Sequence, residues 1–242
     1  MKLLQKINSF FDKYVFNVKW KCNVCGKEIF SGEYFCAECE ENLPFIKGAI
    51  CDNCGRQTLM DVKYCSTCKI YAKSIDKGRS VFNYEKPIDL LIQKFKYSDG
   101  RYLAEVFASF LGNLYTKNNF DADYITFVPM SKKAFKKRGY NQSELLCQEL
   151  SKKIGVEVFY GIEKVKETDR QATLKRKERV KNLKTAFRIK DKKKIVGKNV
   201  LIVDDVTTTG STLDTISNKL KSAGAKYVYF LTVASVPPID KY

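Results

Sequence analysis

Eight of the nine cysteines in this 242-residue chain form four C-x-x-C pairs. Each cysteine of the first two pairs recurs 29 residues later, and a glycine follows the second cysteine of both copies, at Gly26 and Gly55. The spacing indicates an internal duplication of one C-x-x-C-G…C-x-x-C unit, which we assign to a small module over 20–70. The pairs are Cys22/Cys25, Cys36/Cys39, Cys51/Cys54 and Cys65/Cys68.

This pattern predicts two structural zinc sites. Two thiolates two residues apart can hold one Zn²⁺ through a tight turn, and a second pair completes a tetrahedron. Four cysteines leave no open coordination position, so we expect the sites to be structural. A disulfide framework is the alternative, but it requires an oxidising compartment. The duplication favours ligation within each repeat over an interleaved arrangement of the two repeats.

Composition limits the class of protein further. Lys and Arg number 44 against 27 Asp and Glu, and the resulting net charge of +17 predicts attraction to polyanions. The chain has no histidine, so no imidazole is available for metal binding or acid–base chemistry. No apolar run reaches the roughly 18 residues of a membrane-spanning helix, and the first residues do not resemble a signal peptide. We therefore expect a soluble, cytoplasmic protein without membrane insertion.

The N-terminal segment 1–19 is expected to be separate from the cysteine module. Apolar residues at three- and four-residue steps predict an amphipathic helix over 3–15. A helix docked on its own protein is favoured over a membrane-surface anchor, because the segment is short. The apolar positions are Leu3, Leu4, Ile7, Phe10, Phe11, Tyr14 and Val15.

From residue 71 to 242, strand and helix patterns alternate. This alternation predicts an α/β domain with a mostly parallel sheet. Asn141, followed three residues later by Glu144, resembles a capping box, and Cys147 is expected to pack inside the helix that follows. The expected strands cover 80–84, 124–130, 156–160, 199–204 and 226–235, and the expected helices cover 87–96, 101–116, 141–154 and 211–222.

The most informative segment of this domain starts with the apolar run 200–203, which is typical of a central parallel strand. Asp204 and Asp205 follow, and then a hydroxyl-rich loop with Gly210 leads into a helix. Ligands of open α/β sheets bind at the carboxyl ends of strands, and a glycine-containing turn before a helix presents N–H groups to an anion. Two carboxylates beside an anion site are expected to accept hydrogen bonds from sugar hydroxyls.

This segment resembles the phosphoribosyl-pyrophosphate (PRPP) motif of type I phosphoribosyltransferases. The resemblance implies that Asp204 and Asp205 bind the ribose 2′- and 3′-hydroxyls. It also implies a 5′-phosphate site in the loop of Thr207, Thr208, Thr209, Gly210, Ser211 and Thr212. One position departs from the pattern: several purine-base transferases carry an Asp general base where this chain has Thr208.

Two further segments widen the resemblance. Phe127–Lys133 and Lys136–Gln142 contain a V-P-x-x…R-G-[FY]-N-Q pattern, and Gln171, Leu174, Arg179, Asn182 and Phe187 form a Q-x-x-L…R-x-x-N…F pattern. Together with the cysteine module and the PRPP-type loop, these segments are similar to the ComF family of competence proteins over residues 20–235. The implied fold is type I phosphoribosyltransferase-like, with an N-terminal zinc module that uses four cysteines per zinc ion.

The resemblance also implies roles for the basic residues. Pro129, Ser131 and Lys132 would lie in the pyrophosphate loop, with Arg138 nearby, and Mg²⁺ would accompany PRPP. The segment 164–184 matches the mobile loop that closes over PRPP, and it holds nine Lys or Arg. A solvated charged helix would look similar, but five of the eight arginines of the chain lie at 138, 170, 176, 179 and 188, and arginine suits phosphate. Arg170, Arg176 and Arg179 are the candidates for contacting the departing pyrophosphate.

Three functions remain open at this stage. The first is a phosphoribosyltransferase with an unidentified acceptor. The second is a nucleotide- or single-stranded-DNA-binding competence factor without turnover, using basic segments 132–138, 164–184 and 188–198 with Tyr97, Tyr140 and Phe187 as stacking faces. The third is an adaptor whose zinc module docks a partner, such as the DNA-uptake helicase that the resemblance suggests.

Overall fold

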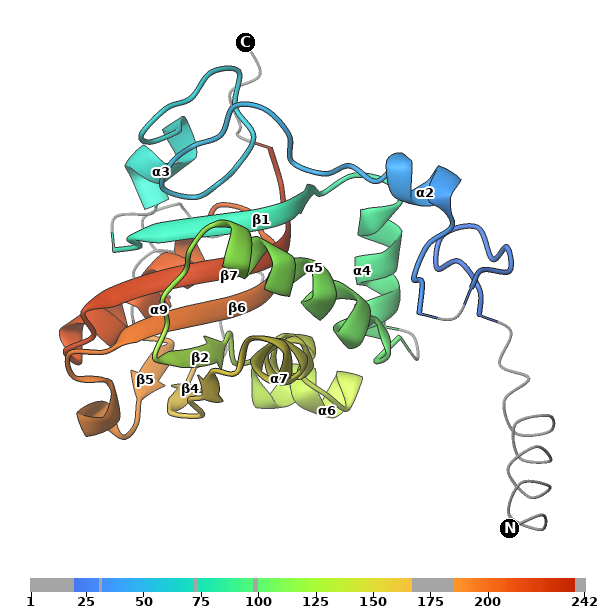
Figure 1. Cartoon of the computed structure of the whole chain (residues 1–242). Helices are drawn as coiled ribbons and strands as arrows, with labels where there is room; N and C mark the ends of the chain where they lie inside the picture. The colour runs from blue at the N-terminus through green and yellow to red at the C-terminus, as the bar shows by residue number, and fades with distance from the viewer. Residues whose placement is uncertain (1–19, 31, 72–73, 98–99, 167–184, 238–242) are drawn as a thin grey trace, which may run out of the picture. The chain divides into compact units, whose positions relative to one another are not determined.

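The computed structural model describes residues 20–30, 32–71, 74–97, 100–166 and 185–237 (Figure 1). The chain divides into two compact units, Met1–Leu43 and Pro44–Tyr242. The predicted helix over 3–15 lies outside the described residues, and the predicted domain boundaries after 19 and 70 stay predictions. Of the helices in the described ranges, none combines the length and the apolar character needed to cross a bilayer.

The first unit contains the first four-cysteine module, residues 20–43. A tight turn brings Cys22 and Cys25 together: the N–H of Gly26 donates to the Cys22 carbonyl at 2.9 Å, and the N–H of Cys22 donates to the Lys27 carbonyl at 2.8 Å. Gly26 has a φ of 75°, a conformation that favours glycine. The second C-x-x-C pair opens the short helix α2 (Ala37–Glu41).

The second unit is built on a five-stranded parallel sheet in the order β1-β7-β6-β2-β3. Its strands are β1 (Lys77–Asn83), β2 (Tyr124–Phe127), β3 (Glu157–Val158), β6 (Asn199–Thr207) and β7 (Tyr227–Ser235). In its described residues, this unit has the helices α3 (Ser66–Tyr71), α4 (Ile88–Tyr97), α5 (Leu103–Lys117), α6 (Lys132–Arg138), α7 (Gln142–Ile154) and α9 (Ser211–Ser222), with a 3₁₀ turn η1 (Lys192–Ile195). The expected α/β class with a parallel sheet is confirmed.

Helices cover both faces of this sheet, with α5 in front and α9 behind (Figure 1). Four consecutive residues of β6, Val200 to Val203, are fully buried, as expected for a central strand covered on both sides. On the α9 face, Val200 and Ile202 share one cluster with Leu213, Ile216 and Leu220. Cys147 is buried in α7, as predicted, and burial raises the pKa of its thiol.

The second four-cysteine module, residues 44–71, belongs to the same compact unit as the sheet. Its four cysteines are buried in the cluster that α9 forms with the sheet. Its turn also lies against β1, because the N–H of Gly78 donates to the Asn53 carbonyl at 2.7 Å and Arg79 Nη1 donates to the Asp52 carbonyl at 2.8 Å. The second module is therefore part of the core.

Several elements differ from the predictions. β2 ends at Phe127 rather than at 130, because Pro129 has no N–H to donate to the sheet. β6 continues past 204 to Thr207, since Val206 and Thr207 still pair with Ala234 and Ser235 of β7. An antiparallel pair, β4 (Ile162–Lys164) with β5 (Phe187–Ile189), and helix α6 were not expected.

Candidate ribose-phosphate cleft and two cysteine clusters

The carboxyl ends of β2 and β6 lie side by side. Phe127 pairs with Val203 in the parallel register, and the N–H of Val128 donates to the Val203 carbonyl at 3.2 Å. The residues that follow Phe127 therefore come next to Asp204 and Asp205. The two segments that the sequence singled out are brought to one edge of the sheet, where ligands of such sheets bind.

The two aspartates have different surroundings. Asp204 Oδ1 accepts from Ser143 Oγ at 2.7 Å and from the N–H of Asp205 at 2.9 Å. Asp205 Oδ2 forms an ion pair with Lys96 Nζ at 2.5 Å, and both side chains are largely buried. Burial, and secondly the charge of Asp205, raise the pKa of Asp204 from 3.8 to about 8.

The loop after β6 has the geometry of an anion site. Gly210 has a φ of 76° at the N-terminal end of α9, a helix of 12 residues. An added Cβ would meet nothing closer than 3.8 Å, so the positive φ rather than space requires glycine here. Thr209 Oγ1 donates to Ser211 Oγ at 2.9 Å and accepts from the N–H of Ser211 at 3.3 Å. N–H groups and hydroxyls in this arrangement are suited to phosphate.

The R-G-Y-N-Q segment links the other wall of the site to the sheet. Gly139, with a φ of 81°, ends α6, and Asn141 begins α7 by accepting from the N–H of Ser143 at 3.1 Å. The Asn141 amide also donates to the Val128 carbonyl at 3.1 Å, which attaches the start of α7 to the loop after β2. Asn141 therefore caps α7 as predicted, but its side chain accepts from the N–H of Ser143 rather than from that of Glu144, as a capping box would require.

These segments enclose a cleft of about 270 Å³. Of the predicted ligand-binding residues, Asp204, Asp205, Thr212, Pro129 and Arg138 line it. The other predicted residues of this site that the structure describes lie beside it: Thr207 is buried, Thr208 is exposed, and Ser131 caps α6 by accepting from the N–H of Ala134 at 3.2 Å. Lys132 is exposed on α6, and Arg170, Arg176 and Arg179 lie outside the described residues.

Lys96 and Ser143 line the cleft without having been predicted, whereas Tyr97 was predicted as a stacking face and Lys164 as the first residue of the mobile loop. Lys96 and Tyr97 come from the end of α4, Ser143 from the start of α7, and Lys164 from β4. Lys96 and Asp205 are far apart in sequence, so no local spacing points to their contact. The R-G-Y-N-Q pattern that precedes Ser143 is the signal that could have found that residue.

The unexpected pair β4–β5 flanks the predicted mobile loop. Lys164 pairs with Phe187 across the two strands, and both residues line the cleft. The chain therefore leaves β4 and re-enters β5 next to the site, with the segment 167–184 between them outside the described residues.

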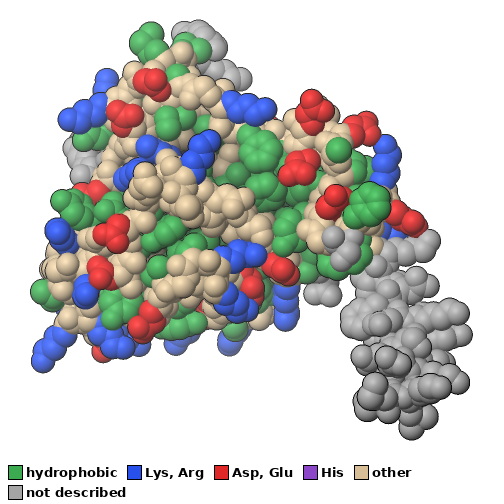
Figure 2. Space-filling view, in the orientation of Figure 1, with side chains coloured by type: hydrophobic (Ala, Val, Ile, Leu, Met, Phe, Trp, Pro, Cys, Tyr) green, Lys and Arg blue, Asp and Glu red, His purple; other side chains and the backbone are tan. Residues whose placement is uncertain are grey.

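The rim of the cleft combines aromatic and basic side chains. Tyr97 is 65% exposed, and the Arg138 guanidinium lies 5.0 Å from the centre of its ring. Figure 2 shows Lys and Arg side chains along the lower edge of this face, over α6 and α7. The prediction of Tyr140 as a stacking face is wrong, because the residue is only 9% exposed and its hydroxyl donates to the Phe95 carbonyl.

The eight paired cysteines form two clusters, and each cluster uses one repeat: Cys22, Cys25, Cys36 and Cys39, and then Cys51, Cys54, Cys65 and Cys68. The predicted grouping of the cysteines within each repeat is confirmed. The Sγ atoms of Cys54 and Cys65 lie 3.8 Å apart, and those of Cys25 and Cys36 lie 3.7 Å apart. Zn–S bonds of about 2.3 Å in a tetrahedron require S–S edges of about 3.8 Å, far longer than a disulfide. The donor sets therefore fit two structural zinc ions.

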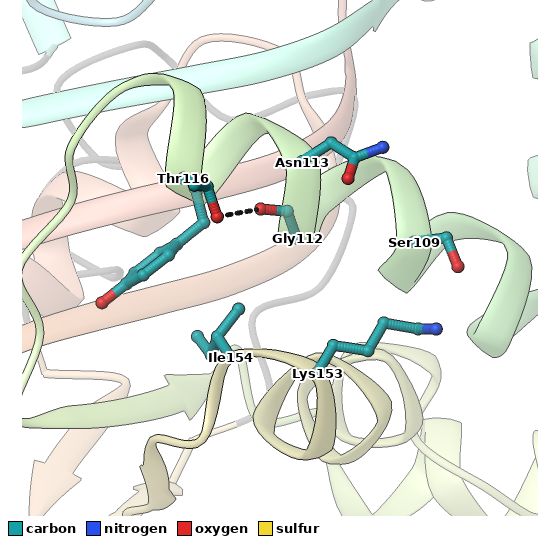
Figure 3. Close-up of a pocket in the computed structure, with 7 residues that line it drawn as sticks. Ser109, Gly112, Asn113, Thr116, Lys153 and Ile154 are labelled. Atoms are coloured by element: carbon teal, nitrogen blue, oxygen red, sulfur yellow. Dashed lines mark hydrogen bonds between the residues drawn. The ribbon is translucent and has the colours of Figure 1, made fainter.

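A second hollow, of about 370 Å³, lies between α5 and α7 (Figure 3). Ser109, Gly112 and Asn113 come from α5, and Lys153 and Ile154 come from α7. Thr116 Oγ1 donates to the Gly112 carbonyl at 3.2 Å, so this hydroxyl is used within the helix (Figure 3). The hollow contains none of the residues that the sequence singled out.

Comparison with known proteins finds a matching family for the cysteine modules and another for the C-terminal part of the α/β domain. Residues 15–69 match the family model of the double zinc ribbon domain, and residues 141–240 match that of the phosphoribosyl transferase domain. Competence protein F of Haemophilus influenzae is 32% identical over 214 residues, which cover 80% of this chain and 93% of that protein. Competence protein ComFC of Streptococcus pneumoniae is 29% identical over 195 residues, with 80% and 84% covered.

Among solved structures, glutamine PRPP amidotransferase of B. subtilis, in complex with ADP and GMP, is similar with a TM-score of 0.41 and 20% identity, over 58% of this chain and 30% of that one. The similarity to competence protein F is much higher in identity and covers most of both chains. This chain therefore belongs to the ComF family, in which a double zinc ribbon precedes a phosphoribosyltransferase domain.

Proposed function

We propose that this chain binds PRPP or a ribonucleotide in the cleft at the carboxyl ends of β2 and β6, as part of DNA uptake. The observation that carries the proposal is the pair of a half-buried Asp204 and a buried Asp205 next to a hydroxyl-rich loop at the start of α9. The names of the relatives, competence protein F and ComFC, support the DNA-uptake role. Eight zinc-suited thiols favour the reducing cytoplasm as the location.

The residues of the cleft have complementary roles in this proposal. Asp204 and Asp205 accept hydrogen bonds from the ribose hydroxyls, while the N–H groups and hydroxyls of 208–212 bind the 5′-phosphate. Lys96, which pairs with Asp205 in the free protein, becomes available for an anionic group of the ligand. Mg²⁺ bound with PRPP would supply positive charge to the leaving pyrophosphate, and Asp204 and Asp205 are the carboxylates of the cleft that could hold it.

Transfer at this site would break the bond between ribose C1 and pyrophosphate and form a bond from C1 to an acceptor. The chain would contribute orientation and positive charge near the departing pyrophosphate. Arg138 and Lys164 line the cleft and would serve this role, together with the predicted contributors Arg170, Arg176 and Arg179. Release of pyrophosphate upon addition of bases or amines, measured with a coupled assay, separates turnover from binding alone.

Calorimetric titration with PRPP and ribose 5-phosphate, with and without Mg²⁺, tests the binding proposal. The double variant Asp204→Asn/Asp205→Asn should lose binding by at least about tenfold, because amides do not make charge-assisted hydrogen bonds to both hydroxyls. The matched control is Asp121→Asn/Asp123→Asn, at the opposite end of β2, which should bind like the unmodified protein. Equal binding by the two double variants would refute the site.

A second function, binding of single-stranded DNA, is favoured by the rim of the same cleft. Tyr97 offers an exposed ring beside Arg138, and α6 contributes four exposed lysine side chains further along the rim. Stacking on an aromatic ring next to cations is typical of sequence-independent single-strand binding. In this arrangement one nucleotide of the strand would occupy the proposed ribose-phosphate site, and the base of the neighbouring nucleotide would stack on the Tyr97 ring at the rim. Docking of a DNA-uptake helicase on the zinc ribbons remains a proposal without a specific contact.

Fluorescence anisotropy with an oligo-dT tests this second function. Lys132→Gln/Lys136→Gln/Lys137→Gln should weaken binding and reduce the salt slope by about two units, since about 0.7 counterions are released per contact on a single strand. The control Lys117→Gln/Lys198→Gln/Lys226→Gln removes three charges near the amino ends of the strands and should have a smaller effect. If both triple variants weaken binding equally, only net charge matters and the rim is not the DNA site.

A further inference from the structure

The second four-cysteine module is attached to the sheet at several points along one turn. Besides the bonds from Gly78 and Arg79, Asn83 Nδ2 at the end of β1 donates to Gln57 Oε1 at 2.7 Å. The turn also contains Arg56, whose side chain leaves the module and reaches the loop after β6. Arg56 Nη2 donates to the carbonyl of Thr208, a residue 152 positions later in the sequence.

The environment of Arg56 is unusual for a cation. Its side chain is buried, with 2% of the residue exposed, and its Nε is buried without a hydrogen-bond partner among the described residues. No carboxylate of the described ranges forms an ion pair with it, although a buried charge is costly without a compensating partner. The Thr207 hydroxyl next to its contact is also buried and, within the same ranges, unpartnered. A cation and a hydroxyl are therefore available beside the proposed phosphate loop.

The internal repeat shows that the cysteine module itself does not require this arrangement. The residue equivalent to Arg56 in the first module is Lys27, 29 positions earlier. Both residues accept the same backbone bond, from the N–H of Cys51 at 2.9 Å and from the N–H of Cys22 at 2.8 Å. The Lys27 side chain, however, is 65% exposed and pairs with Glu38 at 2.8 Å. The backbone role is shared, and only the second repeat directs its cation into the core.

The contact with Thr208 has a consequence for the loop. A peptide group is planar and trans, so the carbonyl of Thr208 and the N–H of Thr209 point in opposite directions. By holding this carbonyl, Arg56 orients the Thr209 N–H toward the other side of the loop. The positive charge behind the loop also favours an anion bound to it.

We propose that Arg56 is a positioning residue through which the second four-cysteine module, and not the first, sets the affinity of the 207–212 loop for a phosphate-bearing ribose. The inference rests on the proposed function, because it assumes that the loop binds the phosphate. It assigns a ligand-binding role to one of two otherwise similar zinc modules. It also predicts reciprocal coupling, in which ligand at the loop retains metal in the second cluster.

The first test compares Arg56→Gln, Arg56→Lys and the matched control Lys27→Gln in the full chain. Zinc content is measured by elemental analysis, and affinity for ribose 5-phosphate and PRPP by calorimetry. Arg56→Gln should retain two zinc ions and lose about tenfold or more in affinity, as expected for a lost charged hydrogen bond. Arg56→Lys should recover part of this loss, whereas Lys27→Gln should bind normally. Normal affinity of a zinc-loaded Arg56→Gln protein would overturn the inference.

The second test uses the unmodified protein, so it holds even where Arg56→Gln does not fold. Zinc release to a colorimetric chelator is followed with and without saturating ribose 5-phosphate, and two phases are expected for the two clusters. The ligand should slow one phase only, and that phase should remain in Cys25→Ser protein, which alters the first cluster alone. Two unaffected phases, or two equally slowed phases, contradict the coupling. If the unmodified protein binds neither ribose 5-phosphate nor PRPP, the proposed function itself fails. If it binds these ligands but zinc release is unchanged, only the coupling to the second cluster fails.

Discussion

At the scale of residues, each aspartate of the cleft contacts a polar side chain from another element: Asp204 accepts from Ser143 of α7, and Asp205 pairs with Lys96 of α4. Burial and the charge of Asp205 raise the pKa of Asp204 to about 8, against 3.8 in an unfolded chain. The folded protein therefore binds an extra proton between about pH 4 and pH 8, and the contribution of this group to stability falls as pH rises through that window. Asp204→Asn should remove this penalty, so the gain in melting temperature over the unmodified protein should increase from pH 5 to pH 8.

Asp123 provides the contrasting control, since its pKa is lowered by the N–H of Asn199 and by Lys198. Asp123→Asn should lose stability that is present above its unfolded pKa near 4, with no further change between pH 5 and pH 8. Thermal unfolding followed by circular dichroism at four pH values measures both effects. A gain for Asp204→Asn that is independent of pH would show that the Asp204 carboxyl is ionised throughout this range.

At the scale of elements, the pairing of β1 with β7 requires a residue without a Cβ at position 78. Gly78 pairs with Phe230 in the parallel register, and an added Cβ would lie 2.0 Å from the Phe230 ring. Gly78→Ala should lower the free energy of unfolding by about 3 kcal/mol or more, because the ring is fully packed and cannot move without disturbing the core.

The same substitution in α5 should have the opposite sign. Gly112 lies inside the helix, and an added Cβ would meet its nearest neighbour, Lys153 Cβ, at 3.8 Å. Gly112→Ala should therefore stabilise the protein by about 0.5–1 kcal/mol through helix propensity alone. Urea unfolding of both variants gives the comparison. If Gly78→Ala and Gly112→Ala lowered the free energy of unfolding by similar amounts, the space around each glycine would not determine the effect of the added Cβ.

At the scale of the whole molecule, the two cysteine clusters should behave differently although their sequences repeat. The second cluster is fully buried and forms part of the core, whereas the first contains an exposed Cys25 and partly exposed Cys36 and Cys39. We expect two zinc ions per chain, with the first cluster losing its metal at lower chelator concentration. Trp20, the single tryptophan, precedes the first cluster and reports on it by fluorescence.

Chelator titration with two signals measures this order. Tryptophan fluorescence should change first, and the far-UV circular dichroism of the sheet unit should change only at higher chelator concentration, together with loss of cooperative unfolding. Cys25→Ser should shift the fluorescence transition alone, and Cys54→Ser should destabilise the sheet unit. A single simultaneous transition in both signals would show that the metal sites are not independent.

Sequence alone determined the features that depend on local spacing. Each C-x-x-C pair follows from a single turn, and the 29-residue repeat favours grouping within each repeat, but only the structure decided this against an interleaved arrangement. The apolar run before Asp204 and the loop through Gly210 likewise predict a strand, an anion-binding turn and a helix, since each follows from neighbouring residues. The α/β class and the presence of Cys147 in a helix core follow from periodicity in the same way.

The tertiary structure decided which distant groups complete these local features. Ser143 is 61 residues from Asp204, and Arg56 is 152 residues from Thr208, so only the parallel pairing of the strands and the docking of the second module bring them together. Tyr140 was expected to be exposed, yet it is buried because the start of α7 packs against the end of α4. Such contacts depend on burial and on the order of strands in the sheet, and neither of these is encoded in the spacing of any single segment.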